Sequence, residues 1–289
     1  MQLGIFARTF PVVGAAAVCE AVRSTGYTTT QFNLACLGGP SMPEAIDPAL
    51  CGQVRAAMQA TGVSMAAVSG TYNMAHPDAA VRARGLARLE VLIAHARALG
   101  TGMVSLCTGS RDPDDQWRHH PDNATAAAWA VMRTEMAAAL QLAERHGIDL
   151  GIEPELANVV SSARAAWRLL EELPSPRLKV ILDPANLFEI AGPDRGRRVI
   201  ADAVDLLGPH IAMAHAKDRA ADGRFVAAGT GVIDFARFVA DLRGVGFDGP
   251  LVTHGLEAGE AAAVAAFLSR ILSVTTDGGR DDVVAHPGA

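Results

Sequence analysis

The chain has 289 residues, of which half are hydrophobic and 19% are charged, and its formal net charge is −6. This size and apolar content favour one large globular domain and exclude a disordered chain. The acidic balance argues against a protein that holds nucleic acid through phosphate contacts. No uncharged apolar run reaches the roughly 18 residues of a membrane span, and no basic segment precedes an apolar run at the start. We therefore expect neither a membrane anchor nor a signal peptide, and a cytoplasmic protein.

Short apolar runs alternate along the chain with longer segments of helical pattern. We predict strands at Gln2–Phe6, Thr28–Leu34, Ser64–Ser69, Met103–Cys107, Asp149–Glu153, Lys179–Asp183, Ile211–His215 and Pro250–His254. Most of them are nearly continuous apolar runs, which is typical of strands buried on both faces of a parallel sheet. The predicted helix boundaries are Pro77 or Asp78 to Gly100, Asn123 to Gly147, a start at Ser161 or Ser162, Asp234 to Gly244, and Glu257 to Leu272.

Eight successive βα units predict an α/β protein of the (β/α)8 type, a TIM barrel, as a single domain over residues 1–272. A doubly wound open sheet is the alternative. Such a sheet usually carries a glycine-rich phosphate turn after its first strand, and none follows Phe6. Residues 273–289 are rich in Gly, Asp and Thr, so we expect them to form a flexible C-terminal tail.

Ionisable side chains stand at the ends of four consecutive predicted strands. These side chains are Glu153, Asp183, His215 and His254. Active sites of TIM barrels lie at this end of the strands, and neighbouring strands are only about 4.8 Å apart, so the four groups can converge. Helix capping is the alternative role for each one alone. Two carboxylates and two imidazoles together predict one divalent metal ion, such as Mn²⁺, Co²⁺, Zn²⁺ or Fe²⁺.

Further polar residues follow the same strands. The chain contains only two lysines, so Lys217, close after His215, is a candidate for binding a substrate oxygen or steadying negative charge. The alternative is a salt bridge between Lys217 and Asp218. Glu155 is either a second carboxylate of the site or a surface acid of a loop.

The segment from Cys107 to Asn123 lacks a core pattern and is long for a loop in a compact barrel, which favours a functional role. Arg111 can clamp a carboxylate or a phosphate. Trp117 can stack on the apolar face of a sugar ring, and His119 can act as an acid, a base or a hydrogen-bond donor. The alternative is a lid in which Trp117 packs only for stability.

Four motifs resemble those of the xylose isomerase-like superfamily of metal-dependent TIM barrels, the group of sugar phosphate isomerases and epimerases. They are GIEPE at 151–155, LDPANL at 182–187, AHAKD at 214–218 and GTGVID at 229–234, and the resemblance extends from residue 2 to residue 272. Ketose 3-epimerases and endonuclease IV-type enzymes belong to this superfamily. The resemblance implies that Glu153, Asp183 and His215 bind the metal and that Glu153 also acts as the catalytic base.

The chain departs from the ketose epimerases at the eighth strand. Those enzymes carry a glutamate there that is both a metal ligand and a base, whereas His254 stands at this position here. Glu257 is the other candidate for the fourth ligand. Asn186 and Asp218 lie in or beside the shared motifs and are further candidates for substrate binding, together with Arg111 and the other loop residues.

The resemblance implies a metal-dependent isomerase or epimerase that acts on a small sugar, sugar phosphate or polyol through a metal-stabilised enediolate. A lyase or hydrolase acting on a keto-sugar or an inositol derivative is the main alternative. An AP endonuclease and a non-catalytic sugar-binding barrel are less favoured. We expect a small-molecule carbohydrate as the partner, without nucleic acid or membrane, and a homodimer stays open.

Overall fold

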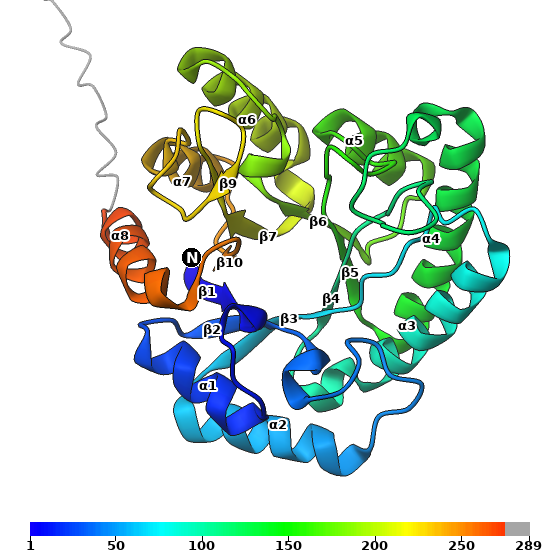
Figure 1. Cartoon of the computed structure of the whole chain (residues 1–289), viewed down its shortest axis with the longest axis horizontal. Helices are drawn as coiled ribbons and strands as arrows, with labels where there is room; N and C mark the ends of the chain where they lie inside the picture. The colour runs from blue at the N-terminus through cyan, green and yellow to red at the C-terminus, as the bar shows by residue number, and fades with distance from the viewer. Residues whose placement is uncertain (275–289) are drawn as a thin grey trace, which may run out of the picture.

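The structure is a computed structural model that describes residues 1–274. Within this range, eight parallel strands close into a barrel in the order β1–β2–β3–β4–β5–β6–β7–β10 (Figure 1). The strands are β1 (Gln2–Phe6), β2 (Thr29–Phe32), β3 (Ser64–Ser69), β4 (Met103–Leu106), β5 (Asp149–Ile152), β6 (Leu178–Leu182), β7 (Ile211–Ala216) and β10 (Pro250–Thr253). The predicted (β/α)8 barrel is therefore confirmed. Of the predicted tail, residues 275–289 lie outside the described part of the chain.

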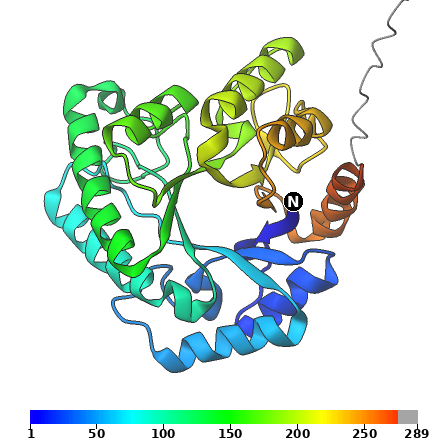
Figure 2. The same cartoon turned by 180° about the vertical axis from the view of Figure 1, so that it is seen from behind.

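Eight α-helices surround the barrel over the same residues, as both views show (Figure 1, Figure 2). They are α1 (Ala15–Ser24), α2 (Pro48–Thr61), α3 (Ala79–Leu99), α4 (Ala126–His146), α5 (Ala163–Glu172), α6 (Pro193–Leu207), α7 (Phe235–Gly244) and α8 (Ala261–Ser273). In the described part of the chain, none of them combines the length and the hydropathy that a membrane span requires. After β7, the strands β8 (Asp218–Arg219) and β9 (Phe225–Val226) form a separate antiparallel hairpin.

Capping side chains explain where the helices begin. As predicted, Asp78, Ser162 and Asp234 cap the starts of α3, α5 and α7. The prediction that Asn123 caps α4 is wrong, because Thr125 holds that position and Asn123 lies in a preceding 3-10 turn. The final helix also starts later than predicted, because a 3-10 turn over residues 258–260 precedes α8.

The interior of the barrel is filled below the ends of the strands. A small apolar cluster from β3, β4, β6, β7 and β10 consists of Ala67, Met103, Ile181, Met213 and Val252. Gly151 on β5 leaves room for it, because a Cβ atom there would lie 2.8 Å from Ile181 Cγ1. A larger core lies between the strands and the helices. Because these side chains fill the interior, the main cavity of the site lies above them, at the carboxyl ends of the strands.

Two irregularities in strand register precede the polar residues at these ends. The pairing of β2 with β3 shifts between Thr30 and Gln31, and the pairing of β6 with β7 shifts between Val180 and Ile181. A bulge of this kind changes the direction in which the following side chains point. The first shift therefore bears directly on Gln31, and the second on the end of β6 before Asp183.

Candidate active site

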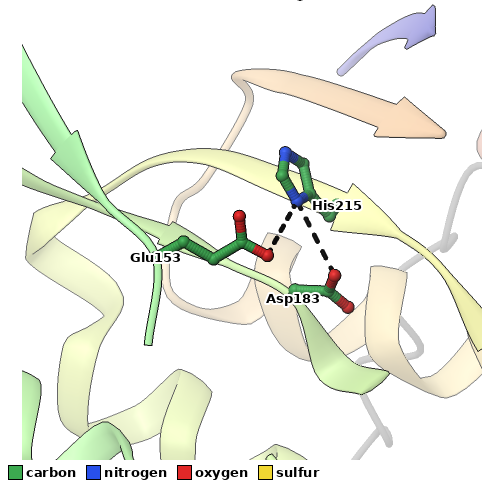
Figure 3. A group of neighbouring side chains, drawn as sticks. All are labelled: Glu153, Asp183 and His215. Atoms are coloured by element: carbon green, nitrogen blue, oxygen red, sulfur yellow. Dashed lines mark hydrogen bonds and ion pairs between the residues drawn. The ribbon is translucent and has the colours of Figure 1, made fainter. Parts of the chain in front are cut away.

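Three side chains converge where β5, β6 and β7 end (Figure 3). Glu153, Asp183 and His215 each offer one ligand atom, and these atoms lie within 4.8 Å of one another. His215 Nδ1 is 3.2 Å from Glu153 Oε1 and 3.7 Å from Asp183 Oδ2. The structure thus brings together three of the four metal ligands that the sequence suggested.

The charge of His215 is set by these carboxylates. Burial lowers the pKa of the imidazole, but the charges of Glu153 and Asp183 and their contacts with the ring outweigh that effect and raise the pKa to about 9. The pKa of Asp183 is in turn held below its ordinary value: burial opposes ionisation, but Lys217 and His215 outweigh it. The three side chains therefore form a buried, strongly polar centre.

His254 lies beside this group and not within it. Its ring is parallel to that of His215, with 5.5 Å between the two ring centroids. The ring centroid of Phe6 lies 5.0 Å from that of His254. Burial, together with the positive charges of Lys217 and His215, lowers the pKa of His254 to about 4, so the imidazole is neutral at pH 7. Its Nδ1 is buried and has no hydrogen-bond partner among residues 1–274. Glu257, the other candidate for the fourth ligand, is exposed and does not line the cavity.

Gln31 reaches His215 from the far side of the barrel. Its Oε1 is 2.8 Å from His215 Nε2, and its Nε2 donates to Ser105 Oγ at 3.0 Å. This geometry places a proton on Nε2 and directs Nδ1 toward the two carboxylates, the arrangement in which a second partner fixes a metal-binding histidine. Sequence reasoning missed Gln31, because the predicted strand Thr28–Leu34 also contains three threonines and Asn33, so one more polar side chain there gave no distinct signal.

Lys217 makes polar contacts with this group of side chains. Its Nζ lies 3.0 Å from Asp183 Oδ2 and donates to Asn186 Oδ1 at 3.0 Å. Asn186 Nδ2 donates to Glu153 Oε1 at 2.7 Å, so this amide connects the ammonium group with the carboxylate. The expected alternative, a salt bridge between Lys217 and Asp218, is absent from the described residues.

Asp218 has a different environment from Lys217. It is fully buried, and its carboxylate accepts hydrogen bonds from the backbone N–H groups of Arg219, Gly229, Gly231 and Ile233. It does not line the cavity. These contacts favour a role in holding the hairpin to the loop at 229–233. Arg219, which sequence reasoning did not single out, does line the cavity, and its Nε donates to the carbonyl of Ala185 at 2.6 Å.

Only some of the predicted substrate-binding residues of the long loop after β4 line the cavity. Trp117 and His119 line the cavity. Arg111 does not, because its Nη1 donates to the carbonyl of Ala75 at 2.9 Å and its backbone N–H donates to Asn123 Oδ1 at 2.7 Å. Long-range hydrogen bonds therefore turn this guanidinium away from the site.

Glu155 is half-buried and lines the cavity, so it is not a surface acid. Burial and the negative charge of Glu153 raise the pKa of Glu155 to about 8, in spite of the opposing effect of Lys217. The cavity has a volume of about 690 Å³. Of the predicted site residues, those that line it are Trp117, His119, Glu153, Glu155, Asn186, His215, Lys217 and His254.

The residues present fit a divalent ion. Asp183 Oδ2 is buried and accepts no hydrogen bond of normal geometry, although Lys217 Nζ is close to it. Two carboxylates and an imidazole with an inward-facing nitrogen form a mixed oxygen and nitrogen set of the kind that binds Mn²⁺, Co²⁺, Zn²⁺ or Fe²⁺. The unpartnered Nδ1 of His254 is available next to this set.

Comparisons with known proteins identify relatives of this chain. The chain is 30% identical over 160 residues to a ketose 3-epimerase of Arthrobacter globiformis, a match that covers 54% of this chain and 51% of that protein. The matched segment thus spans about half the length of this relative.

Solved structures show the same fold. The 3-keto-D-glucoside 4-epimerase YcjR of E. coli superposes with a TM-score of 0.74 and 16% identity, over 93% of this chain and 99% of that one. D-psicose 3-epimerase of Clostridium cellulolyticum H10, solved with D-tagatose, superposes with a TM-score of 0.73 and 16% identity. The match covers 95% of this chain and 100% of that one. The model of the family described as xylose isomerase-like TIM barrel matches residues 19–271. Because this match covers most of the chain, the protein belongs to the xylose isomerase-like TIM barrel family.

Proposed function

We propose that the protein is a metal-dependent epimerase or isomerase of a small carbohydrate. The observation that carries this proposal is the convergence of Glu153, Asp183 and His215 within 4.8 Å beside a large cavity at the mouth of the barrel. The relative and the two structures named above support it, because all three bear names of sugar epimerases.

Glu153, Asp183 and His215 would hold the ion, and His254 would serve as the fourth ligand through its unpartnered Nδ1. When bound, a divalent ion supplies a Lewis acid that polarises substrate oxygens and stabilises the negative charge that develops on them. Gln31 orients His215 for this role, since it occupies the opposite ring nitrogen.

Glu153 is the proposed catalytic base. Its Oε1 accepts the contacts from Asn186 and His215, while its Oε2 makes no side-chain hydrogen bond among residues 1–274. The side chain retains 14% exposure, so this second oxygen can take a proton from a substrate carbon in the cavity. Lys217 lies beside the same group and is proposed to steady negative charge on the substrate.

Two measurements test the proposal. The first is elemental analysis of the purified wild-type protein beside Asp183→Ala and His215→Ala; we expect about one divalent ion per chain in the wild type and little in either variant. The second is NMR of free ketoses and keto-sugars incubated with the enzyme in deuterated water. We expect an isomer that keeps the molecular formula of the substrate except for deuterium at the inverted or transposed carbon. Full metal content in both variants would contradict the ligand assignment, and turnover without exchange would contradict proton abstraction by Glu153.

A further inference from the structure

Three partly exposed apolar side chains face the cavity above the metal-binding group. Trp117 is 48% exposed, Leu156 36% and Phe225 48%, and all three line the cavity. They come from the loops after β4 and β5 and from the hairpin after β7 (Figure 1). Single exposed apolar residues are ordinary on protein surfaces. Three that converge on one cavity mark a surface that binds something apolar.

Trp117 is held in place while its indole remains uncovered. Its backbone N–H donates to Asp115 Oδ1 at 2.9 Å, and Asp112 Oδ1 accepts from the backbone of Asp115 at 2.9 Å. Trp129 shows the contrast: its side chain is packed between helices, its Nε1 donates to Glu172 Oε2 at 2.9 Å, and the residue is only 8% exposed. The loop thus has a defined shape that presents Trp117 to the cavity.

Phe225 is fixed in a similar way on the other side of the mouth. Lys217 Nζ lies 4.2 Å from the centroid of its ring, and Arg219 Cζ lies 4.1 Å from it. Such cation–π contacts orient the ring and leave its remaining surface toward solvent. Both cations are engaged elsewhere too, Lys217 with Asp183 and Arg219 with the carbonyl of Ala185. The mouth therefore offers no unengaged pair of cations for a phosphate.

The cavity is larger than a single sugar. Its volume of about 690 Å³ corresponds to roughly 23 waters at about 30 Å³ each. A hexose, with about 12 non-hydrogen atoms, would fill about half of this space. The polar end of the cavity, near Glu153 and His215, accommodates hydroxyl groups, and the remaining space is bordered by Trp117, Leu156 and Phe225.

We propose that the substrate is a glycoside of a keto-sugar, whose flat apolar aglycone binds among Trp117, Leu156 and Phe225, and not a free monosaccharide or a sugar phosphate. The carbonyl group on the sugar ring is needed because it makes the neighbouring carbon-bound hydrogen acidic enough for Glu153 to remove it. This inference rests on the proposed function, which assigns the sugar ring to the metal-binding end. The aglycone would displace water from the three side chains, and its ring would stack on the indole of Trp117.

The test compares two ligands that differ only in the aglycone. Phenyl β-D-glucoside and methyl β-D-glucoside, and the corresponding pair of D-galactosides, are titrated into the metal-loaded full-length protein by calorimetry. We expect the phenyl compound to bind at least tenfold more tightly in one pair or both. Trp117→Ala should reduce this ratio below threefold, and Trp117→Phe should restore most of it. Val13→Ala is the matched control, because Val13 is 70% exposed but does not line the cavity, and it should leave the ratio unchanged.

Equal affinity within both pairs, no binding of either phenyl glycoside, or a ratio that Trp117→Ala leaves unchanged would each overturn the inference. A change of oligomeric state in Trp117→Ala with an unchanged ratio would show that a second copy of the chain covers these side chains, which also overturns it. Turnover of free ketoses without a phenyl preference would support the proposed function and refute the aglycone site. A phenyl preference without turnover of any free ketose or any glycoside of a keto-sugar would support the aglycone site and refute the proposed function.

Discussion

The two sides of the cavity differ in charge. On the side of β5, β6 and β7, two carboxylates, an imidazole and an ammonium group lie in mutual contact. On the side of β10 and β1 stand His254 and Phe6, one neutral and one apolar. His215 and His254 have parallel rings 5.5 Å apart, yet the pKa of His215 is about 9 and that of His254 about 4. Contacts with carboxylates, and not residue type, decide which imidazole carries charge.

This asymmetry bears on the proposed chemistry. A substrate carbon between the two sides would face the carboxylate of Glu153 on one side and the neutral ring of His254 on the other. Proton transfer by a carboxylate is then available from one direction only. A reaction that inverts a carbon centre requires a second proton carrier, which on the β10 side would be His254 or water.

Loss of the Asp183 carboxylate should have the largest effect on stability and metal binding, because this group contacts both Lys217 and His215 on the charged side of the cavity. Asp183→Asn removes a proposed metal ligand and leaves Lys217 buried without its carboxylate partner. Removing one partner of a buried ion pair costs about 3–5 kcal/mol. We expect a loss of that size in urea unfolding and the loss of bound metal in elemental analysis. The double variant Asp183→Asn with Lys217→Met is the control: it should recover much of the stability and none of the metal. Unchanged stability in the single variant would contradict the pairing.

Replacement of Glu153 tests whether the charged side supplies the base. Glu153→Gln should lower the rate of substrate deuterium exchange by about 10²–10⁴-fold, the usual contribution of general base catalysis. Glu155→Gln is a matched control, since both residues line the cavity and only Glu153 belongs to the metal-binding group. We expect Glu155→Gln to change KM more than kcat. NMR exchange with metal content measured in parallel distinguishes the two, and equal losses of kcat would refute the assignment.

The contact between Gln31 and His215 can be weakened without touching a metal ligand. Gln31→Met approximately preserves the volume of the side chain, but methionine cannot replace the hydrogen bond that Gln31 Oε1 accepts from His215 Nε2. Variants of such supporting residues lower metal affinity by about 10–100-fold, and we expect the same range here from competition with a chelator. Nitrogen-15 NMR of the metal-free protein, at a pH above the His215 pKa of about 9 so that the imidazole is neutral, should show a changed tautomer ratio. An unchanged tautomer ratio together with unchanged affinity would mean that Gln31 does not orient the ring.

The smallest expected effect on metal binding comes from placing a negative charge at His254, on the neutral side of the cavity. His254→Glu replaces the proposed fourth ligand by a carboxylate beside the other three, and added negative charge at this range should tighten metal binding by about tenfold. Chelator competition measures the affinity. His254→Gln serves as the uncharged control and should bind no more tightly than the wild type. Equal affinities in His254→Glu and the wild type would indicate that this side chain does not reach the ion.

The barrel could be predicted from the sequence because most strands are local apolar runs with local turn signals. The error at the second strand had a local cause as well: the side chain of Asn33 caps a 3-10 turn that begins at Leu34, so β2 ends at Phe32. The convergence of Glu153, Asp183 and His215 followed from their positions at the ends of consecutive strands.

Contacts between distant segments could not be predicted in this way. Gln31 meets His215 across 184 positions of sequence, and Arg111 is turned toward Ala75 across 36. No sequence pattern encodes the direction of such side chains, because it depends on how loops and strands meet in the closed barrel. For the same reason the sequence could not show how His254 is placed: its ring lies parallel to that of His215 and beside the group of three, and its role as the fourth ligand stays a prediction.

The carboxylate of Asp218 has a consequence for protein engineering. It binds the backbone of Gly229, Gly231 and Ile233 while its own residue begins β8. A Cβ atom on Gly231 would lie 2.2 Å from the carbonyl oxygen of Arg219, so the two segments fit together without spare room. Attempts to exchange the hairpin with that of another family member should therefore transplant residues 218–233 as one cassette. Chimeras that divide this cassette would combine halves shaped for different partners, and a library of substrate specificities is better built by moving it whole.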